Sequence, residues 1–275
     1  VDESGEHIYY TEYKNEHEGS GLYKFDLELK KEFIVIPPPG VMYGVIMPRL
    51  SQSGDKIAYI LSQKGKPFSV FSYNFETHET KRLFKAKKSV ISFAFDWLPN
   101  DKGIIVFEGS ELSTITFDEK NIVKHTLTVT PKITPYYITV HSDNSLFYSE
   151  KMTQAYSLIK ATDPFSDNPE YEALYKSDKD EYNIAEIINK EGTAHVFVSE
   201  RSGSSQLWLS QNGLTKQLSF FNYDDGSSTF VLGGLRVSPN QQRMIFMKNK
   251  GFSLYDVNAQ KFYPLEEFNK HKIVS

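Results

Sequence analysis

The sequence offers few residues whose type and spacing could support catalysis or metal binding. A serine hydrolase of the α/β type exposes its nucleophile in a Gly-x-Ser-x-Gly turn, and the chain has no such motif. The seven histidines, at positions 7, 17, 78, 125, 141, 195 and 271, lack the His-Glu-x-x-His spacing that places two zinc ligands on one helix face. We therefore predict no catalytic residue and no metal ligand, and interpret His7 and His195 as polar residues at equivalent, tolerant turn positions.

Three further patterns are interpreted as structural. The oxygen-rich segment Asp224-Asp225-Gly226 does not match the spacing of a calcium loop. The glycines of Gly19-Ser20-Gly21 and Gly233-Gly234 lack the strand-to-helix setting of a phosphate-binding loop. The carboxylate pair Glu266-Glu267 could act in acid–base catalysis only if a pocket shifted its pKa values. We expect solvated loops and turns here, and no cofactor.

The elements that position these residues follow a repeat of roughly 47 residues. Its clearest copy is 50–60, where a strand leads through a Ser-Gly-Asp turn into an apolar strand. Gly, Asn, Asp and Ser suit such a tight reversal because they supply positive φ or a side-chain hydrogen bond. The first apolar residues after the six turns are Ile8, Ile57, Ile104, Leu146, Val196 and Met244, at intervals of 49, 47, 42, 50 and 48 residues.

The repeat predicts the fold class. A third strand follows in each unit, as at 22–27 and 206–209, and then a fourth, as at 80–84 and 215–219. Four strands per repeat of this length are typical of a propeller blade. We predict an all-β fold, a six-bladed β-propeller of four-stranded antiparallel blades; a β-sandwich would not explain six evenly spaced copies. The blades are expected at about 1–36, 45–85, 91–129, 136–176, 183–219 and 232–266, as a single domain over 1–275.

The two ends of the chain are expected to meet in the first blade. Only three residues precede the first turn, so this blade lacks an inner strand of its own. The tail at 268–275, which contains Ile273, is long enough for one strand. We expect this strand to close the ring, because an open ring would leave exposed sheet edges.

The composition narrows the class of protein. An aromatic content of 14% favours strands, and a net charge of -4 without a basic stripe disfavours nucleic-acid binding. The absence of cysteine excludes disulfides and thiolate ligands. No run approaches the roughly 18 apolar residues of a membrane span. Because the chain begins at Val1 without a signal-like segment, we expect a fragment or a processed form.

The repeats resemble those of TolB-type propellers, a WD-repeat-like class. The resemblance rests on the turn and strand at 51–60 and on the Ser-Glu-Arg-Ser-Gly loop and following strand at 199–208. It implies one of three settings: a periplasmic partner of an outer-membrane lipoprotein, the propeller of a hydrolase or serine peptidase, or the periplasmic sensor of a membrane regulator similar to CadC and ToxR. Of these we favour the sensor, a non-catalytic bacterial signal-transduction domain of a transcriptional regulator, held at the inner membrane by a segment outside this chain.

Recognition by a propeller is expected at the loops around its axis, where residues are free to vary. In this sequence those loops are rich in aromatic residues, which supply contact area at low entropic cost. We predict that a monomeric domain binds a partner protein or a small ligand there. The predicted binding residues are Tyr43, Tyr136, Tyr137, Tyr182, Arg201, Phe221, Tyr223 and Asp224.

Overall fold

The computed structural model of the chain is built from strands. It describes residues 1–2, 4–87, 93–108, 111–118, 121–126, 138–141, 143–151, 155–164, 166–175, 177, 179–222, 232–248, 251–266 and 268. They fall into two compact units, Val1–Thr130 and Pro131–Ser275, which are treated separately below. Within the described ranges, no helix is both long and apolar enough to cross a membrane.

The first unit contains one seven-stranded sheet and one four-stranded sheet. The larger sheet joins β1 (His7–Asn15), β2 (Gly19–Asp26) and β3 (Lys31–Ile36) to the meander of β4 (Tyr43–Leu50), β5 (Lys56–Gln63), β6 (Ser69–Asn74) and β7 (Thr80–Lys85). The smaller sheet holds β8 (Phe93–Trp97), β9 (Gly103–Glu108), β10 (Glu111–Asp118) and β11 (Asn121–Thr126), with a short 3-10 turn, η1 (Pro99–Asp101), between β8 and β9. The junction of the larger sheet is the parallel pair Ser20 and Gly44.

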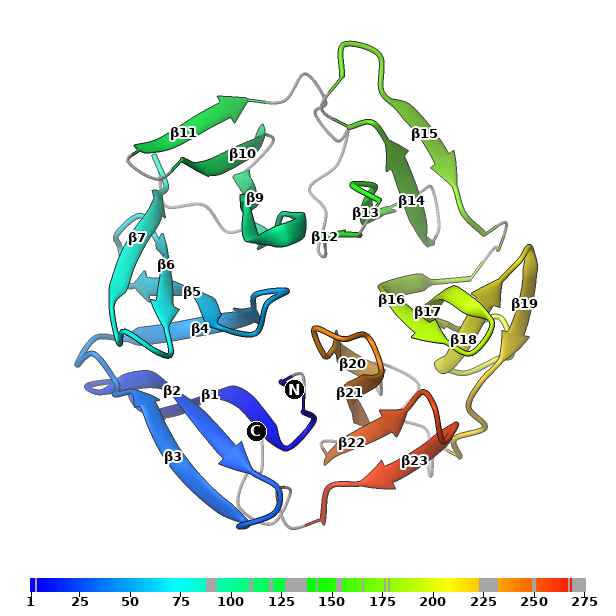
Figure 1. Ribbon diagram of the computed structural model, residues 1–275, viewed down its shortest axis with the longest axis horizontal. Helices are drawn as coiled ribbons and strands as arrows, with labels where there is room; N and C mark the ends of the chain where they lie inside the picture. Colours follow the sequence, from blue (N-terminus) through cyan, green and yellow to red (C-terminus); the bar gives the residue numbers. More distant parts are fainter. Residues whose placement is uncertain are drawn as a thin grey trace. The chain divides into compact units, whose positions relative to one another are not determined.

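The second unit contains three four-stranded antiparallel sheets, each a meander in chain order (Figure 1). The first sheet is β12 (Ile138–Val140), β13 (Leu146–Lys151), β14 (Tyr156–Thr162) and β15 (Glu170–Ala173). The second is β16 (Glu181–Asn189), β17 (Gly192–Ser199), β18 (Gln206–Gln211) and β19 (Leu214–Gln217). The third is β20 (Leu232–Val237), β21 (Arg243–Lys248), β22 (Gly251–Asp256) and β23 (Lys261–Pro264).

The four-stranded antiparallel sheet is confirmed as the building unit, but six separate copies are not. The described strands form four separate four-stranded sheets, while the first seven strands share one sheet because β2 and β4 pair at Ser20 and Gly44. The first repeat supplies only three strands, β1 to β3. The predicted closing strand at 268–275 lies outside the described residues except for Phe268, so closure through Ile273 stays a prediction, as does the single-domain boundary.

The core lies between successive sheets of each unit, which explains why second strands are apolar on both faces. On β5, Ile57 and Tyr59 pack towards Leu22 of β2, whereas the alternate residues Ala58 and Ile60 pack towards the β8–β11 sheet. Successive side chains of a strand point to opposite faces. A strand covered on both sides therefore reads as a continuous apolar run.

The same alternation operates on β17 and prepares the site described next. Ala194, Val196 and Val198 pack on the face that meets the β20–β23 sheet. Phe197 points the other way and packs with Phe147 of the β12–β15 sheet. His195 shares the face of Phe197 because the two residues are two positions apart. A polar residue is thus placed at the end of an apolar interface.

Candidate functional site

His141 occupies a turn position that the fold repeats. Its amide donates to the carbonyl of Ser145 at 2.9 Å, as the amides of Ser51 and Ser238 donate to the carbonyls five residues further on, at 2.9 and 2.8 Å. In the two serine turns, the hydroxyl accepts a hydrogen bond from the amide of the next strand. The ring of His141 makes no such local bond, since neither ring nitrogen has a hydrogen-bond partner among the described residues. The side chain of His141 is therefore available for contacts outside its turn.

Glu186 and His195 reach the same place from the neighbouring sheet. The two residues are directly opposite on the antiparallel strands β16 and β17. Cross-strand partners have their Cβ atoms about 5 Å apart and project from the same face of the sheet. The strand pairing alone therefore brings an imidazole and a carboxylate together.

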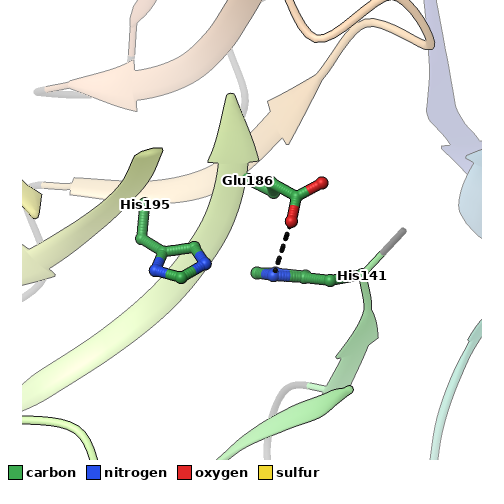
Figure 2. Close-up of side chains that lie close together, drawn as sticks. All are labelled: His141, Glu186 and His195. Atoms are coloured by element: carbon green, nitrogen blue, oxygen red, sulfur yellow. Dashed lines mark ion pairs between the residues drawn. The ribbon is translucent and has the colours of Figure 1, made fainter. Parts of the chain in front are cut away.

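These three side chains converge (Figure 2). One candidate ligand atom from each lies within 4.8 Å of the others, and Nδ1 of His141 is 3.4 Å from Oε2 of Glu186. The side chains of His141 and Glu186 are only 2% and 8% exposed. Phe147 stacks on the ring of His141, with centroids 3.9 Å apart, and its centroid is 5.3 Å from that of His195. The apolar ring thus holds both imidazoles in place.

The surroundings of the cluster favour a neutral imidazole at His195. Burial and the neighbouring His141 lower the pKa of His195 to about 4, and the carboxylate of Glu186 offsets only part of that effect. An uncharged imidazole with a free nitrogen lone pair is the form that binds metals. The cluster therefore presents two nitrogen donors and one oxygen donor, of which His195 is ligand-competent at neutral pH.

This cluster is not predicted by the sequence motifs considered above, because those motifs place metal ligands only a few residues apart. His141, Glu186 and His195 are separated by 45 and 9 residues, and the histidines come from different repeats. These three residues are far apart in the sequence but close together in the structure. One signal could have identified His141: it stands where two other repeats have a serine, Ser51 and Ser238, at the start of the turn. The equivalence of His7 and His195 suggests no shared role, because His7 contacts Asp2 and Asp26 instead.

Tyr43, a predicted binding residue of the first unit, has an unusual conformation. Its side chain is 45% exposed, and its backbone has a φ of 83°. Bulky residues rarely adopt positive φ. The segment is fixed by Ser20, whose single hydroxyl donor lies within hydrogen-bond distance of the carbonyl oxygens of both Tyr43 and Val45, the latter at 2.5 Å. The ring is presented to solvent from a tightly held backbone.

Tyr182 and Phe221, predicted for the same face, are half-buried against the core of the second unit. The hydroxyl of Tyr182 lies 2.9 Å from that of Ser205. The backbone of Phe221 is held by the side-chain amide of Gln206, which accepts from its nitrogen at 2.8 Å and donates to its oxygen at 2.9 Å. The preceding residue, Phe220, is 78% exposed. This loop presents Phe220 rather than Phe221 to solvent.

Arg201 lies against the cluster that includes Phe197, Trp208 and Tyr175. It pairs with the buried carboxylate of Glu181, and its guanidinium lies 5.0 to 5.7 Å from the ring centroids of Trp208, Phe197 and Tyr175. Burial raises the pKa of Glu181, and Arg201 opposes the rise. The remaining predicted residues, Tyr136, Tyr137, Tyr223 and Asp224, lie outside the described residues.

Comparison with known proteins identifies the fold but no family. No protein-family model and no curated protein matches the chain. Among solved structures, the tricorn protease matches 97% of the chain with a TM-score of 0.68 and 14% identity. TolB from Agrobacterium tumefaciens matches 88% with a TM-score of 0.62 and 14% identity, over 86% of its own chain. The β-propeller domain of the Trilobed protease from Pyrococcus furiosus matches 94% with a TM-score of 0.54 and 12% identity, over 81% of its chain.

These likenesses establish an all-β propeller fold of the TolB-like kind, with antiparallel four-stranded sheets. At 14% identity or less they say nothing more about this chain. The chain spans about a quarter of the tricorn protease, because it covers 26% of that protein. The activity of the larger protein is therefore no guide to the site described here.

Proposed function

We propose that this chain is a non-catalytic recognition propeller, which binds a partner protein or a small ligand through aromatic loop residues that include Tyr43. The observation that carries the proposal is that Tyr43 combines an exposed ring with a backbone φ of 83°. Residues in such sparsely populated conformations gather at binding sites, where the surrounding structure holds them. The sequence predicts the same residue from its position in an aromatic loop.

The physical advantage of this arrangement is preorganisation. An aromatic ring on a fixed backbone loses little conformational freedom when a partner covers it. The backbone here is fixed by Ser20 and by the close approach of Gly44, where an added Cβ would lie 2.5 Å from the backbone nitrogen and oxygen of Ser20. In the second unit, the exposed ring of Phe220 is a further candidate contact. Each ring is suited to recognition on its own unit.

The proposed setting is the periplasm, with the propeller as the sensor of a membrane-anchored regulator and its membrane segment outside this chain. The likeness to TolB structures supports this setting at the level of fold. A second candidate is the propeller domain of a hydrolase or peptidase, which the likeness to part of the tricorn protease favours. The complete reading frame separates the two: the sensor requires a membrane span and a DNA-binding domain, and the second candidate requires an attached hydrolase domain.

The test of recognition is a peptide-display selection on the immobilised chain, followed by fluorescence polarisation with the enriched peptides. The variant Tyr43→Ala removes the exposed ring. Its matched control is Tyr171→Ala on β15, because Tyr171 is similarly exposed, at 47%, but is not among the residues with positive φ. Replacement of an aromatic anchor weakens binding by about 2 kcal/mol or more, which corresponds to roughly 30-fold in affinity.

The proposal requires that Tyr43→Ala weakens binding and that Tyr171→Ala does not. Equal weakening by both variants would indicate nonspecific aromatic contacts and would reject a role for Tyr43. If no peptide is enriched, the same variants are compared in thermal-shift screening with amino acids, sugars and nucleotides. If a ligand raises the melting temperature equally in the unaltered chain and in Tyr43→Ala, a role for Tyr43 is also rejected.

A further inference from the structure

We propose that His141, Glu186 and His195 form a binding site for a divalent first-row transition-metal ion, with Zn²⁺ as the best match. Within the described parts of the chain, these are the residues whose donor atoms are grouped closely enough to hold an ion. The site lies in the second unit and is independent of recognition by Tyr43. It would connect the turn after β12 to strands β16 and β17 of the next sheet (Figure 2).

The distances suit a tetrahedral ion. Zinc binds imidazole nitrogen and carboxylate oxygen at about 2.0–2.1 Å, so two ligand atoms of a tetrahedron lie about 3.4 Å apart. Nδ1 of His141 and Oε2 of Glu186 already lie at 3.4 Å. The three candidate donor atoms all lie within 4.8 Å of one another, so an ion would have to draw the most distant of them closer.

The state of His141 is not explained by ordinary hydrogen bonding. Its side chain is 2% exposed, and neither ring nitrogen has a hydrogen-bond partner among the described residues. Buried polar groups are nearly always hydrogen-bonded, because an unsatisfied donor or acceptor keeps its desolvation cost. A metal ion bound to a ring nitrogen would remove part of that cost. The histidine also replaces the serine that makes a local hydrogen bond in the turns at Ser51 and Ser238.

The charge of the cluster also favours a cation. One carboxylate faces two imidazole rings, because Glu186 is the cross-strand partner of His195 and its Oε2 lies 3.4 Å from Nδ1 of His141. A divalent ion would therefore meet two nitrogen donors and one carboxylate oxygen. Of the other charged groups that act on His195, Lys160 is itself paired with Asp143, with Nζ 3.5 Å from Oδ2.

The donor set selects the class of ion. Imidazole nitrogen suits zinc, nickel, copper and cobalt, whereas Ca²⁺ and Mg²⁺ prefer shells made entirely of oxygen. The chain has no cysteine to provide a soft sulfur ligand. Two histidines and one carboxylate are a known set of zinc ligands, which leaves the fourth position for water or another ligand. A hard alkaline-earth ion is thereby disfavoured.

The test is isothermal titration of the chelator-treated, dialysed chain with ZnCl₂, with MgCl₂ as the comparison ion. We expect one Zn²⁺ per chain and no Mg²⁺ binding. Glu186→Gln and His195→Gln, which keep side-chain volume, should each lower Zn²⁺ affinity by at least tenfold. The matched control is His7→Gln, because His7 stands at the equivalent repeat position and also contacts carboxylates, but outside this cluster. It should leave Zn²⁺ binding unchanged.

A second measurement uses the unaltered chain and so does not depend on variants that fold. Long-range ¹H–¹⁵N spectra of the imidazoles should show two of the seven histidines shifting on addition of one equivalent of Zn²⁺. The absence of saturable Zn²⁺ binding would overturn the proposal. Tight binding that persists in the double variant His141→Gln/His195→Gln, or ring shifts at other histidines, would place the metal elsewhere and overturn it too.

Discussion

Ser51 and His141 start related turns, in which the carbonyl of each accepts a hydrogen bond from the amide three residues further on, yet their side chains have different partners. The amide of Ser51 donates to the carbonyl of Lys56 at 2.9 Å, and that of His141 donates to the carbonyl of Ser145, also at 2.9 Å but one residue nearer along the chain. The hydroxyl of Ser51 then accepts from the amide of Lys56 at 3.1 Å, whereas the ring of His141 faces Glu186 and His195 (Figure 2). The side chain of Ser51 therefore stabilises its own turn, whereas that of His141 contacts residues of the neighbouring sheet.

The serine turns should be sensitive to loss of the hydroxyl. Ser51 is fully buried and Ser238 is 2% exposed, so replacement by alanine leaves the amides of Lys56 and Arg243 without these partners. We expect Ser51→Ala and Ser238→Ala each to lower the free energy of unfolding by about 1–3 kcal/mol, measured by urea titration. Ser202→Ala, in an exposed turn, is the control and should change little. Equal, small effects at all three positions would contradict this reading.

How far the sequence predicts the structure depends on how local each feature is. The strands that follow the turns can be predicted from the sequence, because turn chemistry acts over a few residues. The strands predicted at 57–61 and 104–107 correspond to β5 (Lys56–Gln63) and β9 (Gly103–Glu108). The pairing of Ser20 with Gly44 cannot be predicted in this way, since it depends on a close approach of the backbones of two repeats. The spacing of the repeats along the sequence does not indicate which backbones approach one another.

The candidate metal site illustrates the same limit. Cross-strand pairing of Glu186 with His195 follows once the register of β16 and β17 is known, but register is set by packing and by a bulge between Tyr182 and Ala185. The contribution of His141 depends further on how two sheets pack through Phe147 and Phe197. Neither relationship appears as a spacing in the sequence.

Gly44 should tolerate alanine less well than Gly40 does. Both have similar positive φ, 71° and 70°, so both substitutions carry the cost of a left-handed alanine, about 1–2 kcal/mol. Only at Gly44 would the new Cβ lie 2.5 Å from the backbone of Ser20; at Gly40 it meets nothing within 4 Å. We expect Gly44→Ala to destabilise the protein by about 1–3 kcal/mol more than Gly40→Ala, by thermal or urea unfolding. Similar costs would show that the approach to Ser20 relaxes freely.

Asp2 should stabilise the protein at neutral pH but not in strong acid. Burial opposes its ionisation, but hydrogen bonds from His7 and Ser4 outweigh that effect and hold its pKa below 3.8. A carboxylate with a lowered folded-state pKa contributes stability above its unfolded value, and this is lost as pH falls through the folded value. Asp2→Asn should therefore cost about 1–2 kcal/mol at pH 7 and progressively less below about pH 4.

The measurement for Asp2 is urea unfolding from pH 7 to pH 2, with Asp167→Asn as the control because Asp167 is exposed. The free energy of unfolding of the Asp167→Asn control should change with pH in the same way as that of the unaltered protein. A constant difference between Asp2→Asn and the unaltered protein across the whole range would show that the lost contacts do not depend on ionisation.

Arg201→Ala should destabilise the protein in a pH-dependent way, because it leaves Glu181 without its cation. The side chain of Glu181 is 1% exposed and that of Arg201 is 23% exposed. Breaking a buried pair by removing one partner costs about 3 kcal/mol. Burial already raises the pKa of Glu181 above 4.5, and loss of Arg201, which lowers it, should raise it further.

The sign follows from proton binding. Above 4.5 the unfolded chain releases the Glu181 proton while the folded chain retains it, so folded-state stability falls as pH rises towards the folded pKa. The cost of Arg201→Ala should therefore be larger at pH 7 than at pH 4, by urea unfolding. The double variant Arg201→Ala/Glu181→Gln removes the unpaired charge and should recover stability at pH 7. If it is no more stable than Arg201→Ala, then Arg201 acts through its contacts with Trp208, Phe197 and Tyr175 rather than through its charge.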